Sequence, residues 1–365
     1  MARRRSAPLT GVIVTYPDGG PAGLRNRHLL LLPTTVGPRD VGELLRARVP
    51  DARLETQGIA RLGRHCRIYG PFELTMEDAV DAGVPMPWTL AYALDAPIER
   101  DLPPAPGEDD RDGFAQAFPQ GLPWREEARA LHLMVGLARR LQGAVRIHGS
   151  GVLIQPDPQR AVDLLVHSPT WLDPQVVHGI VARVVPGAEL AVAGTDWGGP
   201  GSEVYAGTYT QGLDDPLSPA ELEALHAMAD QADLAALRAR DTIDAYAVVA
   251  ELAGLAALSY GVRPLPGGHA GGQQDGGIEV LVHVSAPGEP SVADQPWGAS
   301  PFVTYEVRWA CAEPEERERR LPASSYLASR ERVRPVVNAV ARALVEAVGG
   351  VVTDEEGFPV DRYHL

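Results

Sequence analysis

The stretch that decides the fold is Leu29–Leu54, LLLLPTTVGPRDVGELLRARVPDARL, because a second stretch of the same design lies 136 residues further along the chain. Leu165–Leu190 reads LVHSPTWLDPQVVHGIVARVVPGAEL and aligns with it without a gap. In each copy an apolar run precedes Pro38 or Pro174, and an amphipathic run ending at a second proline follows. Proline suits the first helical turn and cannot continue a helix past its end. Each copy therefore predicts a strand, a helix and a second strand.

A weaker match, offset by 206 residues, relates Ala138–Ile154 to Leu344–Val360. Both segments contain an amphipathic helical pattern, a small residue or glycine, and an apolar strand with a turn glycine. Together the two matches predict an α+β protein with an internal duplication of two ferredoxin-like (βαββαβ-type) halves. We expect the first half at residues 1–157 and the second at residues 158–365.

The two offsets differ by 70 residues (206 − 136), which predicts an insertion in the second half. Residues 218–261 are rich in alanine and leucine and begin with a capping box, Ser218 with Glu221. We interpret them as a helical insertion whose second helix spans Ile243–Tyr260. The following stretch, residues 264–277, contains many glycines and is predicted to be a flexible loop.

Alternating and apolar runs outside these blocks predict the remaining elements. We expect strands at 29–33, 52–57, 65–74, 88–95, 144–154, 162–168, 188–194, 203–210, 278–285, 302–311 and 351–360. We expect helices at 38–49, 124–142, 173–185 and 329–348.

Composition excludes several classes of function. All 33 basic residues are arginine, so the chemistry of a Walker A, Schiff-base or pyridoxal phosphate lysine is excluded. The formal net charge of −15 disfavours nucleic acid and anionic membranes as partners. The two cysteines, Cys66 and Cys311, lie outside any CxxC motif and suggest a reducing compartment. With no apolar leader run and no apolar stretch long enough to span a bilayer, we expect a cytoplasmic protein.

Two predicted strands carry the same acid-x-Leu-x-His pattern. One contains Asp163 and His167, and the other contains Glu279 and His283. Side chains alternate between the faces of a strand, so each acid shares a face with its histidine. If the strands were neighbours, the four side chains could form a metal or acid–base site, because a carboxylate orients a zinc-binding imidazole. The alternative is a half-polar sheet face that the other half covers.

The other candidate sites are weaker. Asp196 and Trp197, in the loop TDWGGPG, could line a binding pocket, or they could form a turn with a packed tryptophan. Cys66 with His65 or His148 could form a nucleophile–base pair, but adjacent strand residues point to opposite faces, which favours a buried structural thiol. The sequence identifies no catalytic residue, and we expect no cofactor and no bound metal.

These observations favour a non-enzymatic binding or adaptor protein that holds a protein or small-molecule ligand in the cleft between its halves. A metal-assisted hydrolase using His167, His283, Asp163 and Glu279 is the first alternative. A structural or assembly subunit that oligomerises through residues 218–261 is the second.

Overall fold

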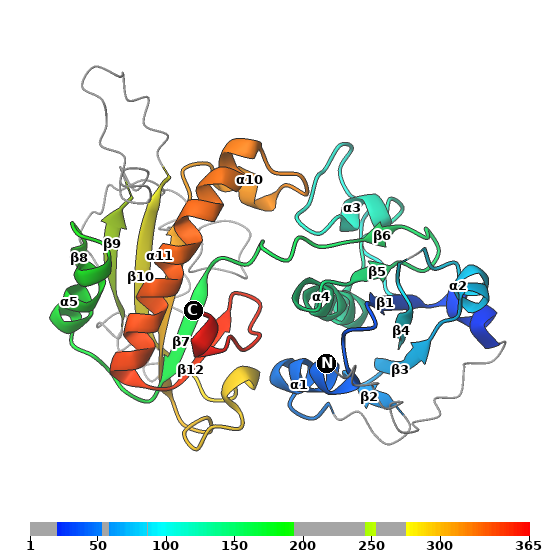
Figure 1. Ribbon diagram of the computed structural model, residues 1–365, viewed down its shortest axis with the longest axis horizontal. Coiled ribbons are helices and arrows are strands. Elements are labelled where there is room, and N and C mark those ends of the chain that lie inside the picture. The colour runs from blue at the N-terminus through cyan, green and yellow to red at the C-terminus, as the bar shows by residue number, and fades with distance from the viewer. Residues whose placement is uncertain (1–19, 53–57, 86, 193–244, 253–274) are drawn as a thin grey trace, which may run out of the picture. The chain divides into compact units, whose positions relative to one another are not determined.

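The computed structural model describes residues 20–52, 58–85, 87–192, 245–252 and 275–365 (Figure 1). The chain divides into two compact units. Unit 1 comprises residues 1–160 and 318–321, and unit 2 comprises residues 161–317 and 322–365. Each unit contains helices and one six-stranded sheet whose strands all pair antiparallel, so the predicted α+β class is confirmed.

Unit 1 is built on a sheet of strand order β2-β3-β4-β1-β5-β6. Its strands are β1 (His28–Leu32), β2 (Ile59–Arg61), β3 (Arg67–Glu73), β4 (Leu90–Asp95), β5 (Ala144–Arg146) and β6 (Leu153–Ile154). Its helices are the 3-10 helix η1 (Gly20–Asn26), α1 (Pro38–Arg48), α2 (Met76–Ala82), α3 (Phe114–Ala117) and α4 (Arg125–Arg140).

Unit 2 is built on a sheet of strand order β12-β7-β11-β10-β9-β8. Its strands are β7 (Leu164–Ser168), β8 (Glu189–Val192), β9 (Ala245–Glu251), β10 (Gly277–Ser285), β11 (Phe302–Ala310) and β12 (Val351–Asp354). Its helices are α5 (Pro174–Val184) and α11 (Ser324–Val348), with the 3-10 helices η2 (Pro290–Val292) and η3 (Arg362–His364). The short helix α10 (Pro314–Glu318) follows β11.

The first strand and helix of the two units correspond residue for residue. Both bounds of β7 and of α5 lie 136 residues after those of β1 and α1. In unit 1 the first strand, β1, lies between β4 and β5, which precede and follow the long helix α4. In unit 2 the first strand, β7, lies between β11 and β12, which precede and follow the long helix α11. The second strand predicted for the first copy, 52–57, falls largely on residues 53–57, outside the described residues.

Local sequence explains where the corresponding helices begin. Proline occupies the first turn of both α1 and α5, where a missing N–H leaves no hydrogen bond unmade. Asp173 caps α5 by accepting a hydrogen bond from the N–H of Gln175 at 2.9 Å. At α1 the N-cap is Gly37, whose N–H donates to the Asp40 carboxylate at 2.7 Å.

The two sheets differ in how their faces are covered. In unit 2 the helices α5 and α11 contact each other and pack on one face, which presents Val166, Val282 and Tyr305 to the core (Figure 1). In unit 1 all five residues of β1 are buried, so both faces of that strand are covered. One of these faces packs under η1 and α2 in a wholly apolar cluster that includes Leu29, Leu31, Ala91 and Ala93.

The predicted helix Ile243–Tyr260 is wrong where the structure describes it, because residues 245–251 form the strand β9. The alanines suggested a helix, but valine fits a sheet better. Val248, Ala250 and Leu252 alternate into the core, and β9 pairs with β8 and β10. Residues 218–244 and 253–261 of the predicted helical insertion lie outside the described residues.

Other predicted bounds change at turns. The predicted strand 144–154 is a hairpin, β5 and β6, because a turn containing Gly149 and Gly151, both with positive φ, interrupts it. Of the glycine-rich stretch 264–277, residues 264–274 lie outside the described residues, and Gly277 begins β10.

Candidate functional site

The two histidines selected from the sequence lie in one row across the sheet of unit 2. His283 on β10 is opposite Thr304 on β11, and Thr304 is opposite His167 on β7. Both histidines lie on the face away from the buried Val166 and Val282. Their strands are not neighbours, since β11 lies between them, which separates the two backbones by about 10 Å.

His167 is bonded through both ring nitrogens. Its Nδ1 lies 3.1 Å from the Thr304 hydroxyl, and its Nε2 lies 3.1 Å from the Thr353 hydroxyl. The ring also meets Phe302 edge-on, with centroids 5.6 Å apart. Burial lowers the pKa of His167 to about 4, against an opposing effect of Glu306. At neutral pH the imidazole is therefore uncharged, and its nitrogens are engaged with threonine hydroxyls.

His283 has a different environment. Its Nε2 lies 2.8 Å from Oε1 of Glu306, and the other carboxylate oxygen of Glu306 pairs with Arg308. Burial favours the neutral form of Glu306, but the hydrogen bond from His283 and the charge of Arg308 outweigh it and hold the pKa of Glu306 below its ordinary value. Within the part of the chain that the structure describes, Nδ1 of His283 makes no hydrogen bond, and the side chain is 35% exposed.

The two acids of the repeated pattern lie away from this row, with Glu279 on β10 and Asp163 immediately before β7. Asp163 and Glu279 each precede their histidine by four residues, roughly 13 Å along an extended strand. Asp163 accepts a hydrogen bond from the N–H of Trp309 at 2.9 Å and pairs with Arg317, while Glu279 lies opposite Arg308. Among the described residues, no three His, Cys, Asp or Glu side chains are grouped to hold a metal ion.

The proposed binding loop with Asp196 and Trp197 lies outside the described residues.

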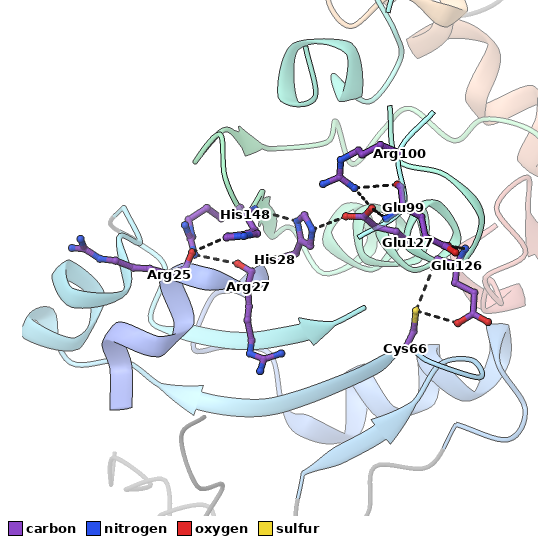
Figure 2. A network of polar contacts seen from close by, with 10 residues as sticks. Arg25, Arg27, His28, Cys66, Glu99, Arg100, Glu126, Glu127 and His148 are labelled. Carbon is purple, nitrogen blue, oxygen red and sulfur yellow. Dashed lines mark hydrogen bonds and ion pairs between the residues drawn. The ribbon is translucent and has the colours of Figure 1, made fainter. Parts of the chain in front are cut away.

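A buried polar network in unit 1 was not expected from the sequence (Figure 2). The N–H of His148 donates to Nδ1 of His28 at 3.1 Å, which assigns the ring proton to Nε2. That nitrogen donates to Oε1 of Glu127 at 3.2 Å. Burial lowers the pKa of His28 to about 3, with smaller contributions from His148, Arg100 and Arg146. His28 is therefore neutral and fully hydrogen-bonded.

Glu127 connects this network to the start of α4. Its Oε2 accepts a hydrogen bond from the N–H of Glu99 at 2.9 Å and pairs with Arg100. In return, Oε2 of Glu99 accepts a hydrogen bond from the N–H of Glu126 at 2.9 Å, so a residue distant in sequence caps the helix. Figure 2 shows these carboxylates gathered at the N-terminal end of α4, which indicates a structural role for the network.

Cys66 belongs to the same region (Figure 2). Its thiol lies 3.6 Å from the carbonyl oxygen of Glu126 and 3.7 Å from a carboxylate oxygen of that residue. Burial, reinforced by the negative charge of Glu126, raises the pKa of Cys66 to about 11. A thiol that stays protonated is a poor nucleophile, which favours the structural reading of Cys66.

The corresponding faces of the two sheets differ in polarity. Leu31 pairs with Ala91, and Leu29 pairs with Ala93, in the apolar cluster of unit 1. At the same positions of unit 2, His167 pairs with Thr304, and Leu165 pairs with Glu306. The polar face of unit 2, defined by His167, His283, Thr304, Glu306 and Arg308, therefore contrasts with the apolar face of unit 1.

Comparisons of this chain with known protein families, with curated proteins and with solved structures find no match. Of the helices that the structure describes, none combines the length and apolar character needed to cross a bilayer.

Proposed function

We propose that the two units are diverged copies of one ferredoxin-like unit. The strand orders β5-β1-β4-β3 and β12-β7-β11-β10 support this, since each is the order of a βαββαβ unit with its helices after the first and third strands. The shared bounds of the first strand and helix add to the support. On this proposal β8 and β9 extend the sheet of the second copy.

We further propose that the protein is a non-enzymatic binding protein whose ligand contacts the polar face of unit 2. The observation that carries this is the replacement of apolar residues at matched positions: Ala93 in unit 1 corresponds to Glu306 in unit 2. Burying charged groups on a sheet face is costly unless they are paired, and His283 and Arg308 pair with Glu306 there. A polar ligand can exchange hydrogen bonds with such a face.

A non-enzymatic role fits the protonation and hydrogen bonding of the two buried histidines, His28 and His167. His28 and His167 are neutral, and both nitrogens of each ring are hydrogen-bonded. The ligand, whether a protein segment or a small molecule, is then recognised without being transformed. That this ligand lies between the two halves stays a prediction from the sequence.

A thermal-shift screen of polar small molecules, grouped as phosphates, carboxylates, amines and sugars, tests the binding proposal. We expect one class to raise the melting temperature of the wild-type protein, and Glu306→Gln and His283→Ala to abolish that rise. Glu77→Gln, at an exposed position of α2 in unit 1, is the matched control and should keep it. A rise that survives both unit 2 substitutions would place the binding site elsewhere.

The second candidate is the hydrolase, which the His283–Glu306 pair favours. A carboxylate at 2.8 Å from Nε2 orients the imidazole and leaves Nδ1 to accept a proton from water or to bind a metal ion. Elemental analysis of the purified protein and assays with chromogenic esters and phosphates test it. Stoichiometric zinc and hydrolytic activity that are both lost in His283→Ala would replace the binding proposal by this one.

The cytoplasmic location and the lack of a nucleic-acid partner remain proposals that rest on the acidic composition and the two cysteines. An assembly role through residues 218–261 also remains a proposal, and light scattering of the purified protein tests it. A single-subunit mass at all concentrations would remove it.

A further inference from the structure

An extended segment, Arg100–Pro106 with the sequence RDLPPAP, lies on unit 1 outside any helix or strand. Pro103, Pro104 and Pro106 each fix their own φ near −65°, and each disfavours helical backbone at the residue before it. Every residue from Leu102 to Pro106 is therefore a proline or precedes one. These restrictions favour the polyproline II conformation for the segment.

Both ends of this segment are fixed by hydrogen bonds. At the N-terminal end, the N–H of Asp101 donates to the Leu122 carbonyl at 2.8 Å, and the N–H of Leu122 donates to the Leu102 carbonyl at 3.1 Å. At the C-terminal end, the N–H of Glu108 donates to the Ala105 carbonyl at 2.9 Å across Gly107, whose φ is +81°. Proline followed by a glycine of positive φ is typical of a type II turn.

The segment does not link two bodies. The N–H of Trp124 donates to the Glu99 carbonyl at 3.0 Å, so the chain leaves and returns to unit 1 at the same place. Residues 101–113 therefore form a loop within unit 1. Asp110 further orders the loop by accepting hydrogen bonds from the N–H groups of Phe114 and Ala115.

The side chains of the segment are displayed to solvent. Leu102 is 77% exposed, and Pro103, Ala105 and Pro106 are also exposed. With three residues per turn, Leu102 and Ala105 form one ridge, and Pro103 and Pro106 form the next. Nearby Ile98 is 70% exposed. An ordered loop that presents apolar ridges in a fixed conformation loses little entropy on binding.

We propose that residues 100–106 bind an aromatic-lined groove of a partner protein domain that recognises polyproline II ligands. In such grooves, aromatic side chains receive the ridges of a P-x-x-P ligand, here Pro103 and Pro106. Arg100 pairs with Glu127, while Asp101 and Glu108 are exposed. The groove that fits is therefore flanked by basic residues. This inference is independent of the function proposed for the polar face of unit 2.

Binding of the full chain to a panel of purified SH3, WW and EVH1 domains, measured by fluorescence anisotropy, tests the proposal. We expect at least one domain to bind, Leu102→Asp to weaken that binding at least tenfold, and Pro103→Ala with Pro106→Ala to weaken it similarly. The affinity should also fall as sodium chloride is raised, because exposed charges are screened.

Pro119→Ala is the matched control, since Pro119 is an exposed proline of unit 1 outside the segment, and it should bind as the wild type does. Because the substituted residues are exposed, all variants should keep the wild-type melting temperature. If no domain of the panel binds, or if Leu102→Asp binds as tightly as the wild type, the proposal is wrong.

Discussion

His28 allows the sharpest test of the structural role given to the buried network of unit 1. Its burial should make the stability of unit 1 depend on pH. Burial lowers the pKa of His28 from 6.5 to about 3 in the folded chain. Between pH 7 and pH 5 the unfolded chain therefore binds more protons than the folded one. The free energy of unfolding must then fall as the pH falls through this range.

The size of this effect follows from the two pKa values. At pH 5 the unfolded imidazole is almost fully protonated, 1.5 pH units below its pKa of 6.5, whereas the folded one is still neutral. At about 1.36 kcal/mol for each pKa unit, His28 should remove about 2 kcal/mol of stability between pH 7 and pH 5. The lowered pKa of His132 acts in the same direction, so the wild-type change should exceed this amount.

Urea denaturation of the wild type and of His28→Gln at pH 7 and pH 5 measures the difference. Because the chain has two compact units, the transition of unit 1 should be followed by hydrogen exchange at β1 and β4. We expect His28→Gln to lower stability at pH 7 and to reduce the pH-dependent loss by about 2 kcal/mol. His65→Gln, at an exposed histidine, is the control and should keep the wild-type dependence. A wild-type dependence that His28→Gln leaves intact would refute the reasoning.

Three further substitutions test packing in unit 2. Gly350→Ala would place a Cβ 2.0 Å from the carbonyl oxygen of His167 at a φ of +99°, so we expect it to lower the melting temperature strongly. Gly179→Ala in α5 is the control. It has open space for the Cβ and should raise the melting temperature slightly, because alanine favours a helix over glycine. If Gly350→Ala and Gly179→Ala changed the melting temperature equally, the close approach of Gly350 to the carbonyl of His167 would be contradicted. Tyr305→Phe removes a hydroxyl that donates to the carbonyl of Thr170 at 2.8 Å and accepts from the N–H of residue 172 at 2.9 Å, so urea denaturation should show a loss of about 1–3 kcal/mol. A loss near zero would show that the loop 170–172 does not need this anchor.

The parts of the fold that could be predicted are those determined by residues close together in the sequence. Pro38 and Pro174 mark the starts of α1 and α5, and the 136-residue offset matches the bounds of strand and helix in both units. The strand at 245–251 could not be predicted in this way. Its alanines and valines suit either element when read alone, and the choice depends on pairing with β8 and β10, which lie far away in sequence.

In the candidate site, too, the features set by neighbouring residues could be predicted and those set by distant residues could not. The alternation of β7 and β10 predicts that His167 and His283 share a face, and the structure places them on one face. Their partners Glu306 and Thr353 come from β11 and β12, so no local pattern indicates them. His28 and Glu127 are likewise 99 residues apart. The one local signal was a histidine opening the apolar run HLLLL of β1.

The central position of β7 has a consequence for how the chain acquires its structure during synthesis. β7 is made early in unit 2, but its neighbour β12 begins only at Val351, after the other strands of unit 2 have been made. Until β12 leaves the ribosome, one edge of Leu164–Ser168 presents unpaired N–H and C=O groups. Such edges pair readily with other chains. We therefore expect chains that stop before Val351 to aggregate more readily than chains that include β12.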